Sequence, residues 1–68
     1  MLIKRNKHYL LKYKDAKGDI TERFIYVMFS NRHSDRITAY CYLRDAKRDF
    51  IVDRMISLNK VKIGVDVL

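Results

Sequence analysis

The chain has 68 residues, with 15 Lys and Arg against 8 Asp and Glu, and a formal net charge of +7. This length suffices for one small domain and excludes large enzymes. A composition of 49% hydrophobic and 34% charged residues is too apolar for a disordered tail and too charged for a membrane span. The charge balance predicts anionic partners, with phosphate backbones first among them.

The cysteine and histidine content argues against disulfide, metal and catalytic chemistry. Cys41 is the single cysteine and cannot form an internal disulfide, and the first residues lack the pattern of a secretory signal, so we expect a cytoplasmic protein. His8 and His33 have no Cys, His or carboxylate at a metal-ligand spacing. No nucleophile has an evident base. We therefore expect no metal, no cofactor and no catalytic residue.

The first half of the chain predicts a β-hairpin. Residues 9–13 alternate as a short strand with Tyr9, Leu11 and Tyr13 on one side, and residues 15–19 supply turn residues around Gly18. Residues 20–29 are dense in β-branched and aromatic side chains and predict a second strand. One face of this strand carries Arg23, Ile25, Val27 and Phe29 and the other carries Phe24, Tyr26 and Met28, so both faces of its second half are apolar. Residues 1–7 fit either a short helical turn or the end of a longer helix.

The second half predicts three more strands. A polar turn at residues 30–35 leads to a third strand at 37–42, which puts Ile37, Ala39 and Cys41 on one face. A fourth strand is expected at 48–53 with Phe50 and Val52 inward, and a closing strand at 61–67. Five short strands with tight turns are typical of a small SH3-like or Sm-like barrel, or of an OB-like Greek key. We predict a mainly all-β, five-stranded SH3/Sm-like barrel, in a single domain over residues 1–68.

Three stretches of sequence carry a family resemblance. They are Tyr13, Asp15 and Gly18 in YKDAKG, Glu22 and Arg23 in ITERFI, and AYCYLRDAKRDFIVDRM over residues 39–55. The series resembles the WYL domain, a bacterial ligand-sensing module, over about residues 8–58. The resemblance implies an Sm-like fold. Asp35, Arg36 and Ile37 stand where the family has its name-giving Trp-Tyr-Leu.

The same resemblance implies a ligand and a set of contacts. WYL domains are implied to bind single-stranded DNA or nucleotide-type ligands and to regulate an attached effector, a helix-turn-helix or helicase domain, which would lie outside this chain. The ligand contacts carried over by position are Arg23, Arg44, Arg48 and Arg54. Arginine suits this task because its planar fork grips phosphate through paired hydrogen bonds. An acidic residue stands next to each of Arg44, Arg48 and Arg54 in the sequence. The alternative is therefore a solvated face on which these arginines form weak ion pairs.

Two tyrosines extend the predicted site. Tyr40 and Tyr42 share the outward face of the third strand and, with nearby arginines, predict a platform on which bases stack. The alternative is that they are ordinary half-buried sheet tyrosines. Arg36, which precedes the same strand, completes the predicted ligand contacts.

Three function classes compete. The first is a non-catalytic regulatory module that binds single-stranded nucleic acid or an anionic nucleotide through an Arg-rich site. The second is a protein–protein or self-association module, a homodimer included, that pairs through the edge strand at residues 61–67. The third, a small basic nuclease using His33, Arg36 and a tyrosine, lacks positioned acid and base partners. We therefore expect a binding module that is not an enzyme.

Overall fold

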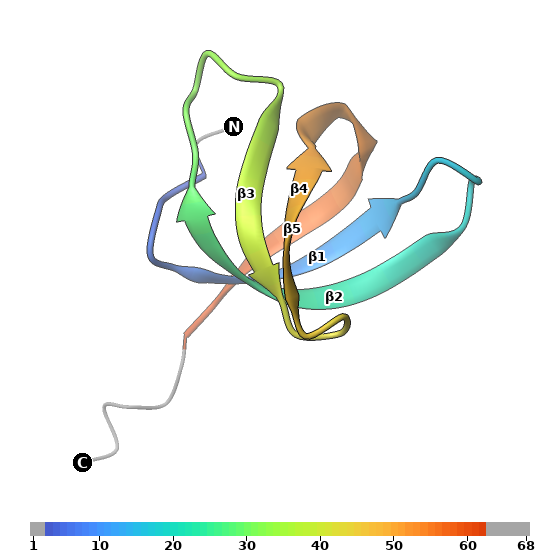
Figure 1. Ribbon diagram of the computed structural model, residues 1–68, viewed down its shortest axis with the longest axis horizontal. Helices are drawn as coiled ribbons and strands as arrows, with labels where there is room; N and C mark the ends of the chain where they lie inside the picture. The colour runs from blue at the N-terminus through green and yellow to red at the C-terminus, as the bar shows by residue number, and fades with distance from the viewer. Residues whose placement is uncertain (1–2, 63–68) are drawn as a thin grey trace.

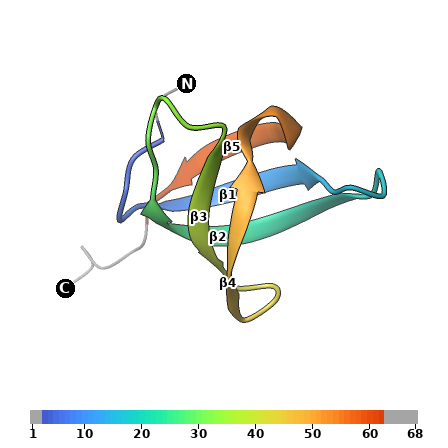
Figure 2. The same cartoon turned by 45° about the horizontal axis from the view of Figure 1, so that its top comes forward.

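The computed structural model describes residues 3–62, which form a single curved antiparallel sheet (Figure 1). Its strands are β1 (His8–Lys14), β2 (Ile20–Phe29), β3 (Arg36–Cys41), β4 (Ala46–Ile51) and β5 (Met55–Val61), in the spatial order β4-β3-β2-β1-β5. A short 3₁₀ helix, η1 (Val52–Arg54), links β4 to β5. The sheet curls so that its two edge strands lie at the ends of one bent layer (Figure 2). The predicted small, barrel-like all-β fold is confirmed.

The β1–β2 hairpin follows from local turn chemistry. The Asp15 carboxylate accepts the N–H groups of Lys17 and Asp19, each at 2.9 Å. Gly18 has a φ of +91°, a backbone conformation that residues with a Cβ rarely adopt. The turn therefore ends where the sequence predicts, and β2 begins at Ile20.

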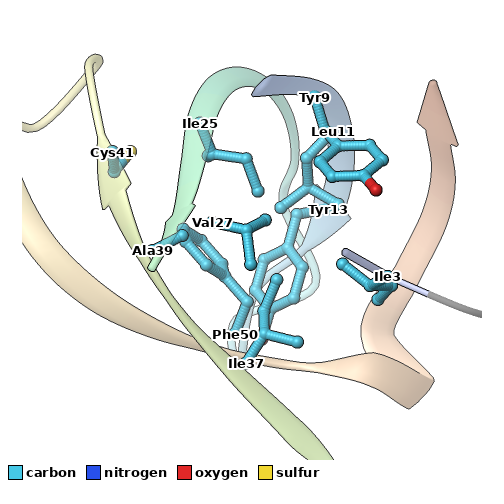
Figure 3. Packing of buried hydrophobic residues seen from close by; sticks show 10 residues of the cluster. All are labelled: Ile3, Tyr9, Leu11, Tyr13, Ile25, Val27, Ile37, Ala39, Cys41 and Phe50. Atoms are coloured by element: carbon cyan, nitrogen blue, oxygen red, sulfur yellow. The ribbon is translucent and has the colours of Figure 1, made fainter. Parts of the chain in front are cut away.

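The concave face of the sheet holds the core. Its buried apolar residues are Ile3, Tyr9, Leu11, Tyr13, Ile25, Val27, Ile37, Ala39, Cys41 and Phe50 (Figure 3). Alternate residues of a strand point to opposite faces, and this alternation correctly predicts the inward residues of β1, of β3 and of β2 as far as Val27. Val52, Met55 and Leu58 cover the edge of this cluster.

The prediction that Phe29 shares a face with Ile25 and Val27 is wrong. The β2–β3 register pairs Val27 with Ala39 but Phe29 with Thr38, so one extra residue, Met28, is accommodated between them. Such a bulge inverts the alternation that follows it. Phe29 therefore shares the outer face with Thr38, and 47% of its surface is exposed.

The predicted boundaries of the fourth and fifth strands also need correction. β4 starts earlier than predicted because Asp45, at a φ of +53°, closes a tight turn that pairs Ala46 with Cys41. It ends at Ile51, because the following residues form η1, where the Val52 N–H donates to the Asp35 carbonyl (2.8 Å).

The fifth strand lies earlier in the sequence than predicted. It spans Met55–Val61 and pairs with β1, whereas most of the predicted strand at residues 61–67 lies outside the described residues. At the other end of the chain, residues 3–7 form a turn instead of a helix, with Asn6 at a φ of +60°. Among the described residues, no helix is long and apolar enough to cross a membrane.

Candidate nucleic-acid interface

Five aromatic rings lie on the outer face of three neighbouring strands. His8 on β1 is in register with Tyr26 on β2, and Tyr26 with Tyr40 on β3. Phe24 precedes Tyr26 by two residues, so both point to the same face. Tyr42 follows β3 directly, and its N–H donates to the Phe24 carbonyl (3.1 Å). We call these five residues the aromatic surface.

The rings of the aromatic surface form a continuous layer. The His8 ring stacks on Phe24 at 5.3 Å between centroids and lies 4.8 Å from Tyr26. Tyr42 lies 5.1 Å from Phe24 and 6.1 Å from His8. Tyr40 meets Tyr42 edge to face at 4.9 Å and 79°. These separations fall in the attractive range for aromatic pairs, so the layer has a defined shape before any ligand binds.

Hydrogen bonds at the rim orient the outermost rings. Tyr42 Oη lies 3.2 Å from His8 Nε2, and 48% of the surface of Tyr42 is exposed. The Tyr40 hydroxyl donates to the Asp45 carboxylate in the β3–β4 turn. This hydrogen bond, with smaller contributions from burial and from the Asp45 charge, raises the pKa of Tyr40 above its ordinary value of 10.0. Tyr40 is half-buried and Tyr42 is exposed.

Exposed basic residues lie in the segments of chain next to the aromatic surface. Lys47 on β4 is in register with Tyr40, and Arg44 lies in the turn between β3 and β4. Arg5 and Lys7 lie in the segment that leads into β1. All four basic side chains are exposed. The segments of chain that adjoin the aromatic surface therefore carry positive charge.

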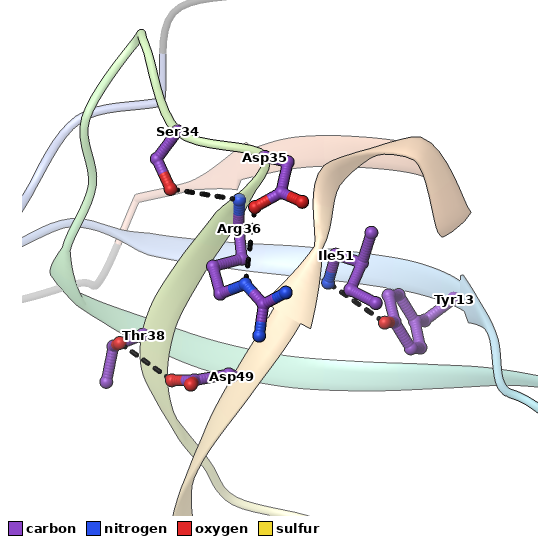
Figure 4. Close-up of polar contacts among 7 residues, drawn as sticks. All are labelled: Tyr13, Ser34, Asp35, Arg36, Thr38, Asp49 and Ile51. Atoms are coloured by element: carbon purple, nitrogen blue, oxygen red, sulfur yellow. Dashed lines mark hydrogen bonds and ion pairs between the residues drawn. The ribbon is translucent and has the colours of Figure 1, made fainter.

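The acidic side chains do little to neutralise this charge. Over residues 3–62 the only ion pair joins Arg36 and Asp35 at 3.3 Å, and both side chains are more than half exposed (Figure 4). The Asp49 carboxylate accepts the Thr38 hydroxyl at 2.8 Å instead of pairing with a cation. Exposed cations without a carboxylate partner remain free to bind phosphate.

Arg23 lies inside the core instead of on the aromatic surface. It is 3% exposed; its Nε donates to Thr21 Oγ1 (3.0 Å) and its Nη1 to Cys41 Sγ (3.8 Å). Its guanidinium carbon lies 5.7 Å from the centre of the Phe50 ring. Arg48 shares this inner face, since it is in register with buried Ala39, but its side chain is exposed.

The structure thus divides the predicted site residues into three groups. Tyr40, Tyr42 and Arg44 are brought together at the aromatic surface. Arg23 and Arg48 lie on the inner face, the first buried and the second at its margin. The remaining two arginines lie near the start of β3 and the end of β4: Arg36 opposite Ile51, and Arg54 in η1.

Sequence analysis missed three members of the aromatic surface, namely His8, Phe24 and Tyr26. Alternation puts Phe24 and Tyr26 on the same face of β2, but no local pattern shows that this face is the outer one or that β1 and β3 present rings beside it. The missing information is the register between strands. Once the hairpin pairing is known, His8 falls opposite Tyr26.

The described residues contain no group of three or more His, Cys, Asp or Glu side chains that could hold a metal ion. Comparison with protein-family models, with curated proteins and with solved structures finds no match. The interpretation of the site therefore depends on its geometry and chemistry.

Proposed function

We propose that the protein is a non-catalytic binding module for single-stranded nucleic acid, which contacts the bases through the aromatic surface. The observation that carries this proposal is the layer of five rings on the outer face of the sheet, each in contact with at least one other ring. The solvent-facing side of an antiparallel sheet is ordinarily polar. Exposed rings on a sheet are a recurrent means of binding unpaired bases, because every base has a face that stacks.

The charges around the surface favour the same ligand. Stacking contributes about 1–3 kcal/mol per base, and lysines and arginines beside the rings can hold the phosphates. Arg44 and Lys47 flank one end of the surface, and neither forms an ion pair in the described part of the chain. A duplex hides its base faces, so we expect a preference for single strands.

The resemblance to the WYL domain supports a regulatory role for such binding. In that role the module senses single-stranded nucleic acid or a nucleotide and controls an effector domain outside residues 1–68.

The test is a fluorescence-anisotropy titration of a labelled single-stranded oligonucleotide with the wild type and with Tyr42→Ala, using duplex as competitor. We expect Tyr42→Ala to weaken binding about tenfold, since about 1.4 kcal/mol of stacking corresponds to that factor. Tyr42→Phe keeps the ring and should bind within about twofold of wild type. Ile56→Ala, at an exposed position on β5, is the matched truncation control and should have no effect.

Two results would overturn the proposal. One is the absence of saturable binding. The other is a loss of binding in Arg48→Ala with no change in Tyr42→Ala, which would move the site to the inner face of the sheet.

Self-association is the second candidate function, and the position of β5 favours it. Over the described residues β5 pairs only with β1, so its other edge is unpaired, and Ile56 is 50% exposed on this strand. Unpaired edges are templates for strand addition. Sedimentation of wild type and Ile56→Lys over a range of concentrations tests this. A mass that rises with concentration only in the wild type supports it, and a wild-type monomer throughout contradicts it.

A further inference from the structure

The outer face carries a further exposed ring beyond the aromatic surface. The bulge at Met28 places Phe29 on this face, opposite Thr38, at the far end of β2 from Phe24. Phe29 is 47% exposed. Exposing an apolar ring to water at the end of a strand is ordinarily unfavourable, but a specific side chain contacts the Phe29 ring.

That side chain belongs to Arg5. Its guanidinium carbon lies 4.5 Å from the centre of the Phe29 ring, and its Nε donates to the Ser30 carbonyl (3.3 Å). No carboxylate pairs with Arg5 within residues 3–62. The guanidinium over the ring therefore keeps most of its N–H donors available for an anion.

The backbone around Arg5 is fixed by several hydrogen bonds. The Asn6 N–H donates to the Val27 carbonyl (2.7 Å), and the Val27 N–H donates to the Lys7 carbonyl (3.0 Å). On the other side of Arg5, the Ser30 hydroxyl donates to the Ile3 carbonyl (2.6 Å). Arg5 is thus held from both sides against the end of β2, and the pair with Phe29 is preorganised.

We propose that Arg5 and Phe29 form a second nucleic-acid contact, at which one base stacks and one phosphate is bound, at the end of a track along β2. This inference rests on the proposed function. The track begins at Phe24, passes Tyr26 and ends at Phe29. Five residues of strand span about 16 Å, which at about 3.4 Å per nucleotide of a stacked strand accommodates about five nucleotides.

The experiment compares oligothymidylates of three, six and ten nucleotides by anisotropy, with wild type, Phe29→Ala and Arg5→Lys. Phe29→Ala should weaken binding of the six- and ten-nucleotide strands about tenfold, because they reach both contacts. For the trinucleotide, which occupies one contact at a time, the change should be at most about twofold. Arg5→Lys keeps the charge but loses the planar guanidinium over the ring, so it should resemble Phe29→Ala.

Tyr42→Ala separates the two proposals. If Tyr42→Ala weakens binding of the six-nucleotide strand while Phe29→Ala does not, the aromatic surface is supported as the binding site and the second contact is refuted. If no strand binds to the wild type, both fail. If Phe29→Ala weakens all three lengths equally, there is no track of two contacts and the inference is wrong. Circular dichroism of each variant confirms that the fold is retained.

Discussion

Arg23 is a buried cation whose protein contacts are a hydroxyl, a sulfur and an aromatic ring. Removing a charge from water without a carboxylate partner is costly, so a methionine of similar shape should fit this site better. We predict that Arg23→Met raises the free energy of unfolding in urea by about 1 kcal/mol. Arg23→Lys, which keeps a charge but loses the bond from Nε, should lower it. A loss of stability in Arg23→Met would show that the polar contacts of Arg23 outweigh its desolvation.

Tyr40 allows a second test on the scale of single residues. Its hydrogen bond to Asp45 raises its pKa in the folded state, so the folded protein retains this proton at pH values where the unfolded chain has lost it. Stability from this group is complete below about pH 10 and falls as pH rises through the folded pKa. Asp45→Asn should return the Tyr40 pKa towards 10.0, as measured by NMR of the tyrosine ring. Asparagine tolerates the positive φ at this position, and an unchanged pKa would contradict the assigned cause.

Among the elements, β4 depends on one side chain for its link to β1. Within the described residues β4 pairs only with β3, and the Ile51 N–H at its end donates to the Tyr13 hydroxyl across the core (2.9 Å; Figure 4). Tyr13→Phe leaves this part-buried N–H without its partner and should cost about 1–2 kcal/mol in urea unfolding. Tyr26→Phe, which loses an exposed bond to Asn6, is the matched control and should cost less than about 0.5 kcal/mol. Equal costs would mean that the Tyr13 bond does not tie β4 to the sheet.

Elements bounded by strong local signals could be predicted from the sequence. β2 spans the predicted residues because a glycine turn precedes a long run of β-branched and aromatic residues. β5 was missed because its sequence, MISLNKV, does not alternate cleanly and its pairing with β1 shifts register between Lys12 and Tyr13. Such a strand is specified by its partner more than by its own pattern.

The candidate site, too, could be predicted from the sequence only where local signals specify it. Alternation alone put Tyr40 and Tyr42 on the outer face. The position of His8 opposite Tyr26 depends on inter-strand register, and that of Phe29 on a bulge. Both features arise when β1, β2 and β3 pair, so no window of sequence contains them.

For the whole molecule, the excess of positive charge makes the salt dependence of binding the decisive quantity. If four cations (Arg5, Lys7, Arg44 and Lys47) each contact a phosphate of a single strand, the slope of log K against log salt should be about −0.7 × 4, near −2.8. Lys47→Ala removes one contact beside Tyr40 and should bring the slope to about −2.1. Lys17→Ala makes the same charge change in the β1–β2 turn and should leave the slope unchanged. If Lys47→Ala and Lys17→Ala reduce the slope equally, nucleic-acid binding depends on the net charge of the protein and not on these contacts. A wild-type affinity that does not change with salt would exclude phosphate binding altogether.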